Sequence, residues 1–199
     1  MQNKTLIALL IGKGSRVPGI LQCVSKIKNA KVVFVLSSVG EDIGTISARQ
    51  RKIKSSVLKW KDYKSRDNGR NEFSIRVRNL LKSYRADLII MAGWRVLMPE
   101  SFIKEFKGRI VNIHPSVLPL YRGDGERAIK AQWEARWARD APPCGCTLHY
   151  VDEGMDTGEP ILRGMVYPRD YLTLEEFSEA IHKKEDEVLC EGLKKLLKN

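Results

Sequence analysis

The sequence lacks a hydrophobic run long enough to cross a membrane. No stretch of about 18 apolar residues occurs in the 199-residue chain, and a membrane-spanning helix needs about 20. The apolar stretch Thr5–Ile11 stops at Gly12 and Lys13 and has no small-residue cleavage site after it, which argues against a secretory signal. We therefore expect a protein that is neither inserted into a membrane nor exported.

Cysteine, glycine and proline are not enriched in the chain. The four cysteines stand at irregular positions and give no disulfide framework, and Cys144 and Cys146 lack a second ligand pair at zinc spacing. This predicts a reducing, cytoplasmic setting. With 15 Gly, 8 Pro and 43% hydrophobic residues, the chain is neither fibrous nor disordered. Its length and the absence of repeats or linkers predict a single domain over residues 1–199.

The charge is strongly positive, because 35 Lys and Arg face 24 Asp and Glu, a net charge of +11. Such a surface attracts nucleic acid, membranes, or small phosphorylated and carboxylated substrates, and composition alone does not choose among them. A nucleic-acid-binding module would show a reader motif or aromatic residues interleaved with a basic face. The sequence shows neither, which argues against nucleic acid as the partner and leaves small-molecule substrates.

Apolar runs alternate with helical periodicity along most of the chain. This pattern predicts an α/β fold in which a three-layer, doubly wound, mostly parallel sheet has helices on both faces. Ligand sites then lie at the carboxyl ends of the strands. The expected strands are Thr5–Ile11, Lys31–Leu36, Asp87–Met91, Arg109–His114, Cys146–Val151 and Ile161–Val166. The expected helices follow Pro18, cover Phe73–Tyr84 and Ala128–Trp137, and begin at a capping box in Thr173–Glu176. Val39–Gly69 reads mostly as loop, with one short strand near Val57–Trp60.

Two polar side chains stand at the end of an expected strand. Asn112 and His114 are two residues apart and so project to the same face, and Pro115 ends regular pairing directly after them. An amide and an imidazole would thus point side by side from the end of this strand. By themselves, however, the two residues also fit a histidine bonded to a backbone carbonyl and an asparagine serving a turn.

A second candidate segment is the acidic, glycine-bearing loop Val151–Pro160 between two expected strands. A carboxylate placed beside His114 would favour the protonated imidazole and prepare it to donate a proton. Asp156 is the candidate for that carboxylate. On composition alone, a solvated turn or a weak cation site would explain the loop equally well.

The loop Gly12–Arg16 lies between the first expected strand and helix. Glycine permits close approach, and a helix N-terminus favours an anion, so the loop suits a phosphate. It lacks the spacing of a Walker loop, and a tight turn would also explain it.

Four segments in order, at residues 10–15, 86–97, 111–119 and 149–158, resemble the folate-dependent formyltransferases. The resemblance spans nearly the whole chain and implies transfer of a formyl group from 10-formyltetrahydrofolate to an amine, without a metal. It implies that Asn112 and His114 stabilise the oxyanion and that Asp156 keeps the imidazole charged. The acceptor that it implies first is glycinamide ribonucleotide of purine synthesis, with an amino-sugar nucleotide as the alternative.

The resemblance also implies the binding residues. For the folate they are Arg70, Trp94, Arg95, Val96, Leu97, Asn112, Asp152, Glu153, Gly154, Met155 and Asp156. For the phosphate of the acceptor they are Gly14, Ser15, Arg16, His182 and Glu185.

The chain departs from the family pattern where Lys13 and Arg16 add charge and where Tyr121–Glu126 replaces a Gly-rich, His-bearing segment. These departures leave the acceptor less defined than the chemistry. A tRNA formyltransferase is expected to carry a further C-terminal domain, and a formyltetrahydrofolate hydrolase an N-terminal one.

Overall fold

The computed structural model describes residues 4–197 of the chain. Its strands form a sheet in the order β3-β2-β1-β4-β5-β6-β7. The pairs β1–β2, β1–β4 and β2–β3 are parallel, and β6–β7 is antiparallel. The expectation of a doubly wound, mostly parallel sheet is confirmed. The strands are β1 Thr5–Ile11, β2 Ala30–Ser37, β3 Lys54–Val57, β4 Leu88–Ala92, β5 Ile110–His114, β6 Gly145–Tyr150 and β7 Pro160–Met165. The helices are α1 Val17–Ser25, α2 Ile43–Gln50, α3 Gly69–Ser83, α4 Glu100–Glu105, α5 Gly125–Ala135 and α6 Leu174–Leu196.

The chain divides into two compact units, and each is described separately. The first contains the described residues up to Val111 together with Leu196 and Leu197, and the second runs from Asn112 to Lys195. The division falls inside β5. That residues 1–199 act as one domain stays a prediction.

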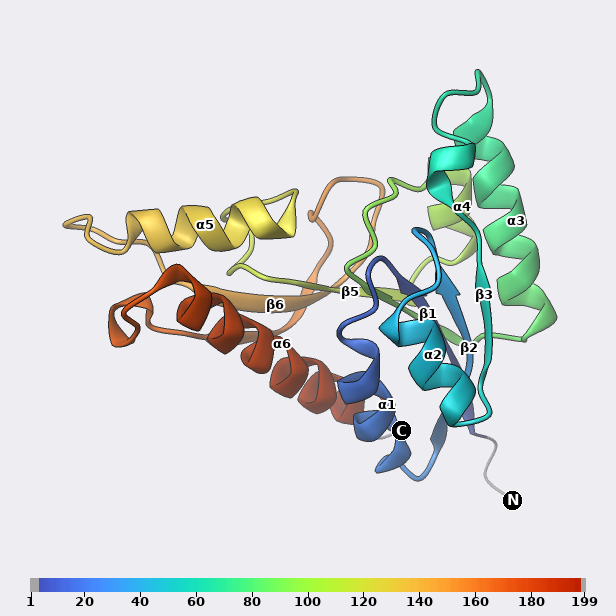
Figure 1. The fold of residues 1–199 in the computed structure, drawn as a ribbon, viewed down its shortest axis with the longest axis horizontal. Helices are drawn as coiled ribbons and strands as arrows, with labels where there is room; N and C mark the ends of the chain where they lie inside the picture. Colours follow the sequence, from blue (N-terminus) through green and yellow to red (C-terminus); the bar gives the residue numbers. More distant parts are fainter. Residues whose placement is uncertain (1–3, 198–199) are drawn as a thin grey trace. The chain divides into compact units, whose positions relative to one another are not determined.

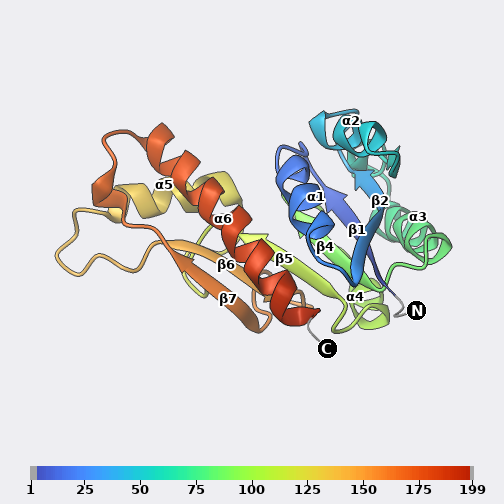
Figure 2. The ribbon, with the colours of Figure 1, turned by 90° about the horizontal axis from the view of Figure 1, so that it is seen from below.

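The first unit is organised around β1, which lies between β2 and β4. Figures 1 and 2 show α1 and α2 on one face of these strands and α3 and α4 on the other. Covered on both faces, residues Ile7–Ile11 are fully buried, which explains why this strand reads as an unbroken apolar run. Its bounds, Thr5–Ile11, are those predicted from the sequence.

The expectation that Val39–Gly69 is mostly loop is wrong. The segment contains α2, and its strand β3 ends at Val57, where the predicted strand was to begin; Trp60 instead opens a 3-10 turn. Helix α2 begins at a capping box in which the Asp42 carboxylate accepts a hydrogen bond of 2.9 Å from the Thr45 amide. The two isoleucines of this helix are exposed, so its apolar residues do not mark the face that packs against the sheet. The residues it buries are Gly44, Thr45, Ser47 and Ala48.

The second unit pairs the β6–β7 hairpin with α5 and α6. An apolar cluster joins the two helices, with the Trp133 and Phe177 rings 5.7 Å apart between centroids. The predicted capping box at the start of α6 is confirmed, because the Glu176 amide donates to Thr173 Oγ1 at 3.2 Å and the Thr173 amide donates to Glu176 Oε2 at 3.2 Å.

Two of the cysteines are buried free thiols, Cys144 and Cys146. Burial raises the pKa of the Cys144 thiol.

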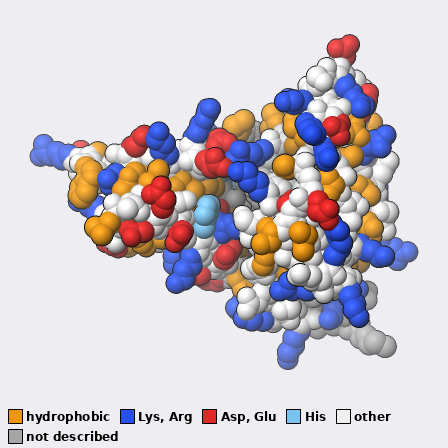
Figure 3. All heavy atoms as spheres, viewed as in Figure 1, with side chains coloured by type: hydrophobic (Ala, Val, Ile, Leu, Met, Phe, Trp, Pro, Cys, Tyr) orange, Lys and Arg blue, Asp and Glu red, His pale blue; other side chains and the backbone are white. Residues whose placement is uncertain are grey.

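The basic side chains form no single stripe on the face that Figure 3 shows. There, Lys and Arg are dispersed, with Asp and Glu among them. Across residues 4–197, no helix has the length and apolar character to span a membrane. No group of three or more His, Cys, Asp or Glu side chains within that range is arranged to hold a metal ion.

Candidate active site

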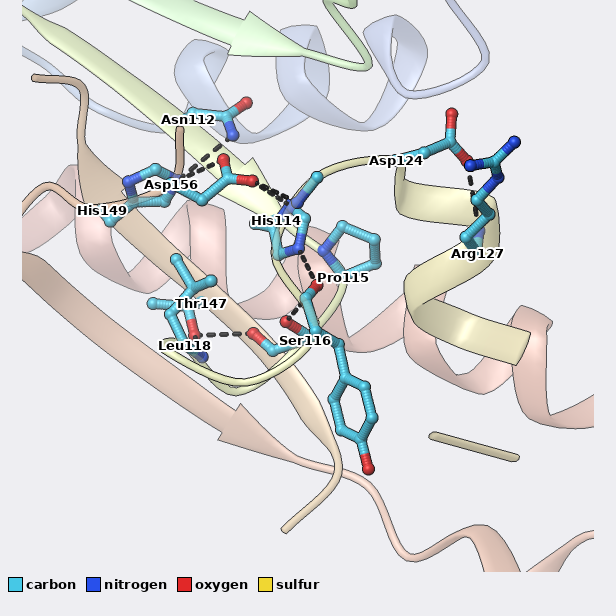
Figure 4. Close-up of polar contacts among 12 residues, drawn as sticks. Asn112, His114, Pro115, Ser116, Leu118, Asp124, Arg127, Thr147, His149 and Asp156 are labelled. Carbon is cyan, nitrogen blue, oxygen red and sulfur yellow. Dashed lines mark hydrogen bonds and ion pairs between the residues drawn. The ribbon is translucent and has the colours of Figure 1, made fainter. Parts of the chain in front are cut away.

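The second unit gathers polar side chains from adjacent strands. Asn112 and His114 come from β5, and His149 comes from β6, the next strand in the sheet. The two histidines are almost fully buried, at 3% and 2% exposure. Figure 4 shows these three side chains together, with the carboxylate of Asp156 between the two imidazole rings. Such burial of polar groups requires that each find a partner.

Asp156 reaches this group from the loop between β6 and β7. Its Oδ2 lies 3.5 Å from His114 Nδ1, and its Oδ1 lies 3.7 Å from His149 Nε2. The Gly123 amide donates to Asp156 Oδ2 at 2.8 Å and fixes the carboxylate in place. The Asp156 side chain is only 13% exposed. The amide, the imidazole and the acid that the sequence analysis selected thus converge within one unit.

The partners of His114 suit a ring protonated on both nitrogens. Nε2 lies 2.9 Å from the Tyr121 carbonyl oxygen, and Nδ1 faces the Asp156 carboxylate. Carbonyl and carboxylate oxygens only accept hydrogen bonds, so only the imidazolium can offer a hydrogen to both. Nε2 of His114 can therefore donate to the Tyr121 carbonyl, while Nδ1 faces a carboxylate beside Asn112.

The loop after β5 sets the position of the Tyr121 carbonyl. Tyr121 adopts a left-handed φ of 52°, which is unusual for a bulky residue. Thr147 on β6 holds this loop: its hydroxyl donates to the Ser116 carbonyl at 2.7 Å and accepts from the Leu118 amide at 3.0 Å. The Ser116 hydroxyl in turn donates to the carbonyl of Leu120, the residue before Tyr121, at 2.6 Å and lies 3.3 Å from the Tyr121 oxygen. One buried threonine thus connects β6 to the partner of His114.

Gln132 on α5 braces the same loop from behind. Its Nε2 donates to the Pro115 carbonyl at 2.6 Å, and its Oε1 accepts from the Gly145 amide at 2.7 Å. The side chain is fully buried. Because Pro115 follows His114 directly, this amide joins α5 and the start of β6 to the end of the catalytic strand.

Reasoning from the sequence missed His149. Its Nε2 lies 3.2 Å from Asn112 Nδ2, and its Nδ1 lies 2.8 Å from the Tyr150 carbonyl oxygen. Burial lowers the pKa of His149 below its ordinary value and outweighs the Tyr150 carbonyl and Asp156, which both raise it. The spacing was a usable signal: Thr147 and His149 on β6 repeat the two-residue separation of Asn112 and His114 on β5.

The Asp152 carboxylate stabilises the turn in the loop predicted to bind folate. Asp152 Oδ1 accepts from the Gly154 amide at 3.1 Å and from the Thr157 hydroxyl at 2.6 Å. Met155, in the same turn, is 56% exposed. Glu153 completes the predicted set in this loop, and it too is exposed.

The other predicted folate residues belong to the first unit. Arg70 is exposed in the first turn of α3. Trp94 follows β4 and lies against Phe73, with ring centroids 5.8 Å apart. Val96 is 6% exposed and so packs as a core residue, whereas Leu97 is 48% exposed. Arg95, which lies between Trp94 and Val96, is exposed.

The residues predicted to bind the acceptor phosphate are divided between the units. Gly14 in the first unit has a left-handed φ of 72°, and its carbonyl accepts from the Val17 amide at 3.1 Å where α1 begins. Ser15 and Arg16 lie between them. In the second unit, His182 Nδ1 lies 2.9 Å from Oε2 of Glu185, which is buried on α6.

Known proteins of one family are similar to this chain. The family model described as formyl transferase matches residues 4–193. A phosphoribosylglycinamide formyltransferase of Haemophilus influenzae is 30% identical over 85% of this chain and 76% of its own length. The crystal structure of a phosphoribosylglycinamide formyltransferase from Bacillus halodurans superposes with a TM-score of 0.85 at 29% identity, covering 96% of this chain and 95% of that one.

Longer relatives match over a small part of their length. The trifunctional purine biosynthetic protein adenosine-3 of Chironomus tentans is 32% identical over 90% of this chain, which spans only 13% of that protein. The match to the family model and to shorter relatives nevertheless covers most of the chain. The protein belongs to the formyl transferase family.

Proposed function

We propose that this chain transfers the formyl group of 10-formyltetrahydrofolate to the amine of glycinamide ribonucleotide in purine synthesis. The names of its relatives and structural neighbours support this acceptor over an amino-sugar nucleotide. The observation that carries the proposal is the buried convergence of Asn112, His114 and Asp156 in the second unit. The participants are small molecules, and a cytoplasmic location follows from the proposed pathway.

The reaction would use these three residues around one oxygen. The amine attacks the formyl carbon, and the carbonyl oxygen becomes an oxyanion. Asn112 Nδ2 and the Nε2–H of His114 donate to that oxygen, and one such placed donor contributes about 3 to 4 kcal/mol. In this structure the Nε2–H points at the Tyr121 carbonyl, so the formyl oxygen must approach the same hydrogen.

The intermediate then collapses toward products. The bond from the formyl carbon to the folate nitrogen breaks, the attacking amine loses a proton, and the departing folate nitrogen gains one. In this proposal Asp156 balances the charge of the imidazolium and orders a water that carries this proton.

We further propose the binding roles taken from the family resemblance. For the folate, the residues that the resemblance implies include Arg70, Arg95 and Leu97, which are exposed in the first unit. In the second unit they are the residues of the Asp152–Asp156 loop. For the acceptor phosphate, Gly14, Ser15 and Arg16 precede α1, whose start favours an anion, and the resemblance adds His182 and Glu185 of α6.

Acceptor identity is tested by assaying each candidate acceptor separately. The protein is incubated with 10-formyltetrahydrofolate and, separately, with glycinamide ribonucleotide, an amino-sugar nucleotide or charged initiator tRNA, and release of tetrahydrofolate is followed. We expect turnover with glycinamide ribonucleotide. Turnover with the amino-sugar nucleotide alone would reject the proposed acceptor, and hydrolysis without any acceptor would reject transfer. The His114→Ala variant is the control for background release.

A further inference from the structure

We propose that His149 is a positioning residue that acts as a neutral hydrogen-bond acceptor and fixes which way the Asn112 amide faces. This inference rests on the proposed function for its kinetic consequence, but its structural content does not. It concerns the pair of rings on either side of Asp156, which no pattern of residue types identified in advance.

The first step is the tautomer of His149. Nδ1 lies 2.8 Å from the Tyr150 carbonyl oxygen, which can only accept a hydrogen bond. The hydrogen must therefore be on Nδ1. The ring is 2% exposed, and burial disfavours its charged form. A neutral ring with hydrogen on Nδ1 leaves Nε2 with a lone pair and no hydrogen.

The second step is the orientation of Asn112. A lone pair on His149 Nε2 needs a donor, and the atom 3.2 Å away is Asn112 Nδ2. If the amide were turned over, its oxygen would face that lone pair and both groups would lose a bond. One hydrogen of Nδ2 is thus donated to His149, and the second is held in a fixed direction. Under the proposed function this second hydrogen is the one given to the formyl oxygen.

The third step is the effect on Asp156. A neutral His149 has no hydrogen to offer to Asp156 Oδ1, 3.7 Å from its Nε2. A cationic His149 would offer one and would compete with His114 for this carboxylate. Asp156 and Asp152 favour that cation, His114 opposes it, and burial opposes it most. The neutral ring therefore also leaves the carboxylate to His114.

A double-mutant cycle tests the kinetic part. His149→Leu removes the hydrogen-bond acceptor and fills the buried space with an apolar side chain. His149→Gln provides an acceptor oxygen in place of the ring nitrogen. We expect His149→Leu to lower kcat by about 10- to 100-fold, because a misdirected oxyanion donor loses much of its effect, with little change in KM. His149→Gln should recover most of the loss.

The decisive comparison is made in the Asn112→Ala background. If His149 acts through Asn112, the His149→Leu change should lower kcat there by less than about threefold, since residues in one network are not additive. Full additivity of the two losses would overturn the proposal. A wild-type kcat in His149→Leu would do the same.

Nuclear magnetic resonance of the wild-type protein with ¹⁵N-labelled histidine tests the structural part without any substrate. We expect His149 to carry hydrogen on Nδ1 and none on Nε2 at pH 7. A hydrogen on Nε2, or on both nitrogens, would overturn the assignment even if the enzyme is active. Conversely, if no acceptor is formylated, the proposed function fails while this measurement still decides the state of His149.

Discussion

The ends of β5 and β6 each carry a buried histidine, and the groups around the two rings favour opposite hydrogen-bonding roles. Each ring has a backbone carbonyl at one nitrogen, Tyr121 for His114 and Tyr150 for His149. The other nitrogen of His114 faces a carboxylate, whereas that of His149 faces an amide nitrogen. The same side chain is thus suited to be a cationic donor on one strand and a neutral acceptor on the next. Neighbouring groups, more than residue type, set the role of each.

The largest expected effect comes from removing the cationic member. His114→Ala deletes the proposed oxyanion donor and leaves the proposed folate residues of the first unit unchanged, so transfer should fall by about 10³-fold or more. Steady-state kinetics and equilibrium binding of a folate analogue together check this. A variant that binds folate and turns over normally would remove His114 from the mechanism.

A smaller loss is expected when the charge beside His114 is neutralised at constant shape. Asp156→Asn keeps an oxygen for the Gly123 amide but removes the charge that stabilises the imidazolium, so single-turnover transfer should slow by about 10²-fold. Thermal unfolding measured alongside is the control for retained structure. An unchanged rate of transfer would show that the Asp156 charge is not what distinguishes the role of His114 from that of His149.

The loop that places the Tyr121 carbonyl can be loosened from β6. Thr147→Val preserves shape but leaves the Ser116 carbonyl and the Leu118 amide without their partner. We expect the free energy of unfolding to fall by about 1 to 3 kcal/mol in denaturant titration. Thr147→Ser, which keeps the hydroxyl, should lose clearly less; equal losses would show that the methyl group and not the hydroxyl matters.

The smallest effect is a change in acid stability at His149. Burial lowers its pKa in the folded protein below the unfolded value of 6.5. Below that pH the unfolded chain binds more protons than the folded one, so stability is lost as pH falls. His149→Gln removes this contribution, and its free energy of unfolding should decline less steeply than that of the wild type below about pH 6.5. Parallel curves would place the His149 pKa at its ordinary value.

The sequence predicted an element correctly where its hydrophobic pattern had a single explanation, burial on both faces of the sheet. The run Thr5–Ile11 is buried on both faces, and its bounds followed from apolarity alone. It failed at α2, because the residues that this helix buries are small or polar and its cap lies in side-chain hydrogen bonds. Such a helix is specified by close packing, which is not visible as hydrophobic periodicity.

The site residues also divide into those selected from the sequence and one, His149, that was missed. Asn112, His114 and Asp156 were selected because residue type and order resemble a family, and the structure then gives their distances. His149 stands two residues after Thr147 in a strand of apolar appearance, and this spacing alone also fits a histidine of the core. Its contacts with Asn112 and Asp156 become visible only when β5 and β6 are neighbours.

The left-handed backbone of Asp156, with a φ of 53°, bears on how this position can vary over time. Asparagine and glycine tolerate such a φ, whereas β-branched and bulky residues do so only under strain. Random replacement at residue 156 should therefore yield two populations: loop-preserving Asn or Gly proteins that have lost the carboxylate, and the remainder, which are poorly folded as well. Inactive descendants of this gene would be expected to carry Asn or Gly in place of Asp156.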